Sequence, residues 1–280
     1  ITGGEIASNS SQWGGGINAN GHPTVTLSGT GAVKDNTSTA NAAGIFLEGD
    51  DGQGTTFTMT GGSITGNKAG GNGGGIMGYS YTQTVTINIS GGTITGNTAS
   101  GLGGGIYVET GGRVNIQGAP VVTGNTAGGK ANNVYVCADS TSPLLTISGE
   151  LTDGAKLGVS TDASYPVLLA NREQDYSAYF TPDDPDAFVL FSGSALTLCA
   201  KPSATLEGDT LTVSTGSNHK SDAFVLFVAE YGADGRLLAI QSEQITAESG
   251  TYTFKVQSGA TIKCFLLHAD TVSYTHLTLP

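Results

Sequence analysis

The chain has 280 residues, of which 44 are glycine, more than twice the usual share of about 7%. Charged residues make up only 12%, the formal net charge is −12 and there are only 8 prolines, so collagen-like and proline-rich stalks are excluded. An anionic chain without a basic patch is repelled by phosphate backbones and by anionic lipid, which disfavours nucleic acid and charged membrane surfaces as partners. The longest apolar runs, Phe224–Ala229 and Cys264–Leu267, are far shorter than the ~20 residues of a membrane span.

Three short motifs recur in constant order about every thirty residues in the first half of the chain. The first pairs glycine with a β-branched residue and ends on an asparagine: Asn9, Asn36, Asn67, Asn97 and Asn125. The second is a run of small residues that ends on Ile17, Ile45, Ile76, Ile106 and Val134. The third alternates apolar residues with Thr or Asn, at Thr24–Leu27, Thr56–Met59, Val85–Ile89, Arg113–Ile116 and Leu144–Ile147.

None of these motifs has the spacing of a helix. Each repeat therefore holds three strands of about three to five residues, joined by glycine-rich corners. Three short strands per repeat are typical of one coil of a parallel β-helix, whose equivalent strands stack roughly 4.8 Å apart. The sequence predicts an all-β protein with a right-handed parallel β-helix over residues 1–150.

The glycine tracts Gly70–Ile76 and Gly101–Ile106 fit corners where φ is positive or where coils approach closely. The repeated asparagine suits a left-handed corner residue, and stacked asparagines can form a hydrogen-bonded ladder. A row of substrate-binding asparagines is the alternative interpretation.

The pairing of GGGI with Ile64–Asn67 and Ile94–Asn97 resembles the GGAI and FxxN signatures of polymorphic membrane protein repeats. Isoleucine stands here where those repeats usually have phenylalanine. The resemblance covers about residues 1–150. It implies a surface-displayed adhesin or autotransporter passenger of the pectin-lyase-like β-helix superfamily.

The composition changes near residue 150, because 35 of the 44 glycines lie before it. We interpret residues 151–200 as final coils with a capping insertion, Asn171–Asp186, which is polar and helical at its start. Residues 201–271 have the turns and short strands of an immunoglobulin-like sandwich. The expected strands are Ala204–Leu206, Thr210–Ser214, Ala223–Tyr231, Leu237–Gln241, Gly250–Val256 and Thr261–Leu267.

The run FVLFVAEYGADGRLLAIQ resembles the middle hairpin of fibronectin-type-III-like modules in bacterial surface proteins. The final segment, Val272–Pro280, reads VSYTHLTLP and resembles translated read-through of a sequencing adapter. We interpret residues 272–280 as such an artefact, which truncates the immunoglobulin-like module, and expect the chain to be an internal fragment from metagenomic reads.

A catalytic site is a further hypothesis, because parallel β-helices include polysaccharide lyases and hydrolases with paired carboxylates. Two acidic sets are candidates: Glu48 with Asp50 and Asp51, and Asp183 with Asp184 and Asp186. Both have the composition of solvated loops, Gly21–His22–Pro23 departs from the GHG motif of polygalacturonases, and no RIK motif is present. The sequence therefore predicts no catalytic residue, and a lyase or hydrolase is kept as the alternative.

No metal, cofactor or phosphate site is expected either. The histidines lack partners at metal-ligand spacing: His22, His219, His268 and His276. The three cysteines, Cys137, Cys199 and Cys264, form no CxxC pair and are expected to be small core residues.

Exposed aromatic residues on the corners remain as binding candidates: Trp13, Tyr79, Tyr81 and Tyr107. Tyr79 and Tyr81 lie in the longest insertion, whereas Tyr107 follows a GGGI strand and can instead extend an outer ladder. The expectation is a monomeric, non-enzymatic, extracellular bacterial protein, secreted or on the cell surface. Its partner is expected to be a host glycan or protein, with a purely structural stalk as a further alternative.

Overall fold

The computed structural model describes residues 1–49, 54–81, 83–138, 143–215, 224–245, 250–268 and 274–279, with residues 268 and 274–279 described by their backbone only. Within these ranges the protein is all-β, and its helix is the single 3-10 turn η1 (Ser177–Tyr179). The expected helical start of the insertion is wrong, because Asn171 is the last residue of a strand and η1 begins only at Ser177. The chain divides into two compact units. The first unit comprises Ile1–Ala163 and Leu168–Pro185, and the second comprises Ser164–Val167 and Asp186–Pro280.

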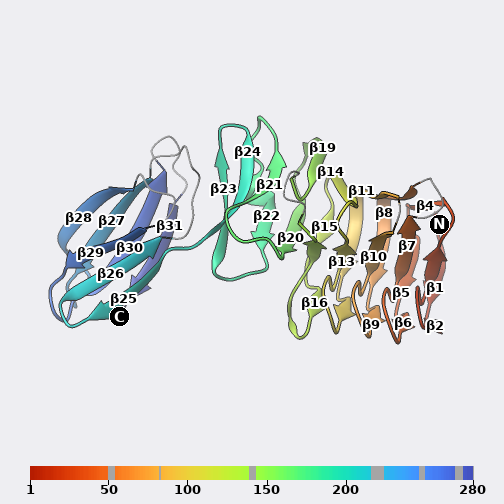
Figure 1. The fold of residues 1–280 in the computed structure, drawn as a ribbon, viewed down its shortest axis with the longest axis horizontal. Coiled ribbons are helices and arrows are strands. Elements are labelled where there is room, and N and C mark those ends of the chain that lie inside the picture. Colours follow the sequence, from red (N-terminus) through yellow and green to blue (C-terminus); the bar gives the residue numbers. More distant parts are fainter. Residues whose placement is uncertain are drawn as a thin grey trace. The chain divides into compact units, whose positions relative to one another are not determined.

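The first unit is a parallel β-solenoid of about 5 turns, as the repeats predict (Figure 1). The strands that follow the small-residue motif form one row: β3 (Ile17–Ala19), β7 (Ile45–Gly49), β10 (Ile76–Ser80), β13 (Ile106–Val108) and β18 (Val134–Val136). A second row holds β1 (Glu5–Ala7), β5 (Ala32–Lys34), β15 (Val121–Val122) and β20 (Lys156–Thr161). A third row holds β4 (Thr24–Leu27), β14 (Arg113–Gly118) and β19 (Thr146–Leu151).

Strands β8 (Thr55–Thr65) and β11 (Val85–Thr95) differ from the prediction, because each runs without a break through the second and third rows. Gly62 and Gly92 allow this, since their φ angles of 78° and 82° turn the strand without ending it. A fourth row of two-residue strands was also not expected. Its parallel members are β2 (Ser10–Ser11), β6 (Thr37–Ser38), β9 (Lys68–Ala69), β12 (Thr98–Ala99) and β16 (Thr126–Ala127).

Ladders of apolar side chains fill the interior of the solenoid. One ladder runs through Val33, Ile64, Ile94, Val122 and Leu157, which are register partners on successive coils. Another runs through Ile17, Ile45, Ile76, Ile106 and Val134. Because equivalent positions face inward in every coil, each apolar side chain is buried by those above and below it.

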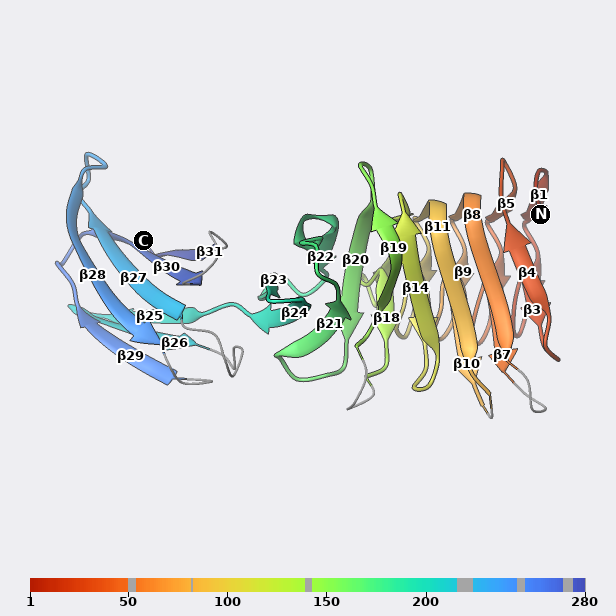
Figure 2. The same cartoon turned by 90° about the horizontal axis from the view of Figure 1, so that it is seen from above.

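The coils continue past residue 150 (Figure 2). Strand β20 belongs to two rows, since Lys156 pairs with Val121 of β15 and Val159 pairs with Val134 of β18. The short strand β17 (Lys130–Ala131) turns back antiparallel to β16 and shortens the last full coil. Strand β22 (Phe180–Pro182), from the polar insertion, then pairs in parallel with β20. Strand β21 (Val167–Asn171) precedes η1 in the chain.

The second unit is built from antiparallel strands, and β25 to β30 lie within a few residues of the expected ranges. The prediction of final solenoid coils up to residue 200 is wrong for its last part, because β23 (Ala187–Ser192) and β24 (Ala195–Ala200) form an antiparallel hairpin that belongs to this unit. One sheet has the order β25 (Ser203–Glu207), β26 (Thr210–Thr215), β29 (Gly250–Lys255). The other sheet has the order β28 (Leu237–Ile245), β27 (Phe224–Tyr231), β30 (Thr261–His268), β31 (Tyr274–Leu279). A single apolar core, which includes Leu211, Leu226 and Ile262, lies within this unit.

Strand β31 lies in the segment that we interpret as adapter read-through. The structure pairs it antiparallel with β30, from Ile262 opposite Leu279 to Leu267 opposite Tyr274. An alternating apolar segment satisfies the backbone groups along an otherwise open edge of β30, which accounts for this placement.

Candidate functional site

A ladder of asparagine side chains runs along the solenoid. In each coil, the backbone N–H and the Nδ2 of one asparagine donate to the Oδ1 of the asparagine in the next coil, over 2.8–3.1 Å. From Asn36 to Asn125, the Nδ2 also donates to a backbone carbonyl of the preceding coil. The members are Asn9, Asn36, Asn67, Asn97, Asn125 and Asn133.

The ladder is structural, because Asn36, Asn67 and Asn97 are 0% exposed and Asn125 is 1% exposed. No ligand reaches these amides, which contradicts the alternative of a substrate-binding row. The expected left-handed conformation was also placed on the wrong residue. It belongs to the residue before each asparagine, namely Ser8, Asp35, Gly66, Gly96 and Gly124, with φ between 54° and 68°.

The ladder ends on Asp183, which the sequence analysis had assigned to a solvated loop. Its carboxylate accepts hydrogen bonds from the backbone N–H of Asn133 (2.6 Å), from the Nδ2 of Asn133 (2.5 Å) and from the Oγ of Ser160 (2.7 Å). Since an ionised carboxylate has no donor, it ends the ladder without leaving a buried N–H unpaired. Asp183 therefore has a structural role that the sequence analysis missed. In the same segment Asp184 is half-buried and Asp186 is exposed.

The glycines of the GGGI motif make room for this ladder. At Gly75, an added Cβ would lie 2.5 Å from the carbonyl oxygen of Gly105 and 3.2 Å from the Nδ2 of Asn97. The first glycine of the tract, Gly73, has a φ of 71° and lies against the side chain of Met77. Both reasons that the sequence suggests for these glycines, the positive φ and the close approach of coils, are confirmed.

A run of aromatic side chains, here called the aromatic row, lies along β7 and β10 and consists of Trp13, Phe46, Tyr79 and Tyr81. Ring centroids are 5.6 Å apart for Trp13 and Phe46, 6.2 Å for Phe46 and Tyr79, and 5.9 Å for Tyr79 and Tyr81. Trp13 is 41% exposed and Tyr81 is 65% exposed. The structure thus brings three of the four aromatic candidates together.

Tyr107, the fourth candidate, is only 7% exposed and stacks on Tyr135 at 5.8 Å. It extends an outer ladder, which was the second interpretation of this residue. Phe46 was missed by the sequence analysis. The sequence did carry a signal for it, because Phe46 follows the motif residue Ile45 as Tyr107 follows Ile106. In the structure Phe46 is the register partner of Met77 on the next coil.

A cavity of about 350 Å³ adjoins the aromatic row, within the first unit. Its apolar wall is formed by Trp13, Phe46, Met77 and Tyr79. These residues come from neighbouring coils, so the wall depends on the register that the solenoid imposes.

The polar lining of this cavity consists of two carboxylates, Glu48 and Glu109, and two amides, Asn18 and Asn41. Glu48 accepts a hydrogen bond from the Nδ2 of Asn20 at 2.7 Å. Asn41 is held by the hydrogen bond that its Oδ1 accepts from the backbone N–H of Asn72, also at 2.7 Å.

The electrostatics of the cavity are anionic. Burial raises the pKa of Glu109 above its ordinary value, because the charged form loses hydration. Burial also raises the pKa of the Tyr79 hydroxyl, and the nearby carboxylates of Glu109 and Glu48 add to this effect. Among the described residues that line the cavity, none is a lysine or an arginine.

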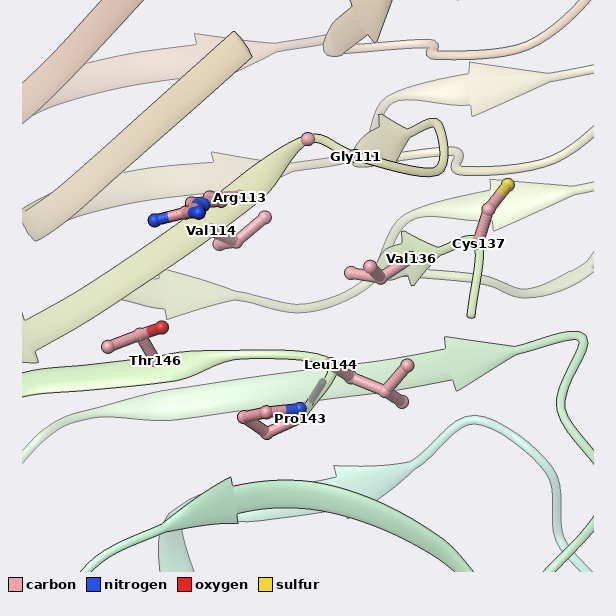
Figure 3. A pocket seen from close by; sticks show the side chains of 9 residues that line it. Gly111, Arg113, Val114, Val136, Cys137, Pro143, Leu144 and Thr146 are labelled. Carbon is pink, nitrogen blue, oxygen red and sulfur yellow. The ribbon is translucent and has the colours of Figure 1, made fainter. Parts of the chain in front are cut away.

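A second hollow, of about 310 Å³, lies beside Arg113 and Cys137 (Figure 3). The Cys137 thiol donates to the Tyr107 hydroxyl at 3.4 Å, and burial raises the pKa of this thiol. The reactive thiolate is therefore disfavoured. In Figure 3 the side chains of Arg113 and Cys137 do not face each other, so the hollow assembles no reactive pair.

The other predicted residues assemble no site. Asp50, Asp51 and His219 lie outside the described residues, as do the side chains of His268 and His276. His22 is half-buried in a turn with a φ of 65°. Cys199 and Cys264 are buried in the core of the second unit, as expected. In the part of the chain that the structure describes, no three His, Cys, Asp or Glu residues gather as a metal site.

Helices that could cross a membrane are absent from the described ranges. No protein-family model matches the sequence, and no curated protein matches it. A solved structure of an endonuclease/exonuclease/phosphatase from Beutenbergia cavernae DSM 12333 is similar over 34% of this chain and 36% of that chain, with 14% identity and a TM-score of 0.20. A likeness this weak supports no statement about fold or activity. The class that the coordinates define is a parallel β-solenoid followed by antiparallel sheets.

Proposed function

We propose that the protein is a non-enzymatic, adhesin-like protein, secreted by bacteria or displayed on their surface, whose β-solenoid presents a binding flank to a host glycan or protein. The observation that supports this function is the aromatic row beside a cavity. Trp13 and Tyr81 expose large apolar rings on a scaffold fixed by backbone and asparagine ladders. Such rings stack on sugar rings and serve as anchors in protein interfaces.

The sequence resemblances support the same proposal. The GGGI and ITGN motifs are similar to those of polymorphic membrane protein repeats, which belong to right-handed, pectin-lyase-like β-helices of surface adhesins. We further propose that the second unit is an immunoglobulin-like or fibronectin-type-III-like spacer, a role that fits its two antiparallel sheets around one apolar core.

The proposal is tested by glycan arrays and by adhesion of the labelled protein to host cells. The double variant Trp13→Ala/Tyr81→Ala should lose at least about tenfold in affinity, because anchoring rings are worth more than 1.4 kcal/mol each at recognition sites. Leu237→Ala, which removes another exposed apolar side chain in the second unit, is the matched control and should bind as the wild type does. Blank arrays together with absent cell binding would favour a purely structural stalk.

A polysaccharide hydrolase is the second candidate, and one observation favours it. Glu48 and Glu109 line the same cavity, and glycoside hydrolysis commonly uses two carboxylates, one of them with a raised pKa as the general acid. Incubation with a polysaccharide panel distinguishes the two functions. If the wild type released reducing ends and Glu109→Gln did not, the non-enzymatic proposal would be wrong.

A further inference from the structure

We propose that the cavity beside the aromatic row binds a positively charged amino sugar, with the ammonium group held by Glu48 and Glu109. This inference rests on the proposed glycan-binding function and adds the charge of the ligand to it. The ammonium group is the feature that separates such a sugar from neutral or N-acetylated ones.

The cavity is complementary in charge to an ammonium group. Two carboxylates line it, and none of the described residues that line it has a cationic side chain. In the described part of the chain, the Glu109 carboxylate has no hydrogen bond and no ion pair, although it is partly buried. Among the described residues, the groups on which the Glu109 charge acts include Tyr79, Tyr107 and Cys137, and none of these three is a cation. A bound ammonium would supply the missing counter-charge.

The cavity also combines apolar and polar surfaces. The exposed ring of Trp13 offers an apolar face for the C–H groups of a sugar, and aromatic rings also attract cations. The amides of Asn18 and Asn41 supply donors and acceptors for ring hydroxyls, and the Nδ2 of Asn41 has no hydrogen bond within the described ranges. A volume of about 350 Å³ is in the range of small-molecule sites. A lysine side chain would need the carboxylates but not the amides.

The inference is tested by calorimetric titration of the full chain at pH about 6, above the ordinary pKa of carboxylates and below about 7.7, the pKa of an α-amino group, which like the amine of glucosamine has electron-withdrawing neighbours. The probes are a glucosamine oligosaccharide, its N-acetylated counterpart of equal length, and Nα-acetyl-lysine amide. We expect the glucosamine oligosaccharide to bind at least about tenfold more tightly than the N-acetylated one, as a charge-assisted hydrogen bond predicts.

The variant Glu109→Gln keeps the shape of the side chain and removes its charge. It should weaken binding of the glucosamine oligosaccharide by about tenfold or more, whereas Glu150→Gln, which changes an exposed side chain of β19, should leave binding unchanged. Wild-type affinity should also fall as the pH is lowered through the raised pKa of Glu109, because the proton competes with the ammonium.

The remaining outcomes distinguish failure of the charged-ligand inference from failure of the proposed glycan-binding function. Equal binding of the two oligosaccharides would overturn the charged-ligand inference and leave the glycan-binding function standing. Binding of the lysine derivative alone would overturn it in favour of a protein partner. If no probe bound here and no glycan bound on the arrays, both this inference and the glycan-binding function would fail.

Discussion

Single residues decide the stability of the solenoid where a polar side chain is fully buried. At Asn67, the Oδ1 accepts from the backbone N–H and the Nδ2 of Asn36, and the Nδ2 donates to Asn97 and to Val33. Every hydrogen-bonding group of this amide is used, which is the condition under which a buried polar group is tolerated.

We therefore expect Asn67→Ala to lower the free energy of unfolding by about 3 kcal/mol or more, because it leaves several buried groups without partners. The control is Asn88→Ala, which removes one hydrogen bond between the half-buried side chains of Asn88 and Asn115 and should cost less than about 1 kcal/mol. Urea denaturation followed by circular dichroism measures both. Equal losses would contradict a structural role specific to the buried ladder.

Glu109 illustrates a residue that works against stability. Its pKa in the folded protein is raised by burial, so the folded state holds the proton more tightly than the unfolded chain does. Stability is therefore greatest below the unfolded pKa of about 4.3 and falls as the pH rises through the folded pKa.

Glutamine does not ionise, so Glu109→Gln should raise the unfolding midpoint at neutral pH and make no difference below about pH 4. Thermal unfolding between these pH values tests this, with Glu150→Gln as the exposed control. A lower midpoint for Glu109→Gln at neutral pH would mean that the carboxylate stabilises the fold, contrary to a residue retained for binding.

At the scale of the element, the GGGI turn and the asparagine ladder form one structural unit. The third glycine lies where the amide of the ladder approaches the backbone, so neither motif works without the other. We expect Gly75→Ala to destabilise the solenoid by about 2–4 kcal/mol, because the new methyl group overpacks a site bounded by backbone that has no room to move.

Gly3→Ala is the matched control, since an added Cβ there meets only the hydroxyl of Thr30, at 3.6 Å. It should change the unfolding midpoint little. Both variants can be compared by the urea midpoint and by hydrogen exchange along β10 and β13, where the effect of Gly75→Ala should be largest. A tolerated Gly75→Ala would show that adjacent coils can separate at little cost.

The same elements show how much the sequence predicts. The regular spacing of Asn9 to Asn125 was enough for the solenoid and its ladder, because each coil has nearly the same length. Asn133 and Asp183 were missed because the hairpin of β16 and β17 shortens the coil, and because Asp183 returns from 50 residues further along the chain. Neither Asn133 nor Asp183 follows the repeat spacing of about thirty residues.

The candidate site was predicted in part for a similar reason. Trp13, Tyr79 and Tyr81 were recognisable as large rings at corners, but their gathering depends on the stacking of three coils. Glu109 carried no local signal. It lies one residue beyond β13, and only the alignment of that strand with β10 and β7 places it in the cavity with Glu48.

At the scale of the whole molecule, each of the two units has its own apolar core. The solenoid core includes Ile87, and the core of the second unit includes Leu226, both 0% exposed. Trp13 is the single tryptophan of the chain, so its fluorescence reports on the solenoid alone.

We expect Ile87→Ala and Leu226→Ala each to cost about 2–5 kcal/mol, but in different units. Ile87→Ala should lower the urea midpoint observed by Trp13 fluorescence. Leu226→Ala should leave that midpoint unchanged and instead accelerate hydrogen exchange in β27 and β30, because units with separate cores open separately. If Leu226→Ala lowered the Trp13 midpoint as much as Ile87→Ala does, the chain would unfold as one cooperative block, and the solenoid would owe part of its stability to the sheets that follow it.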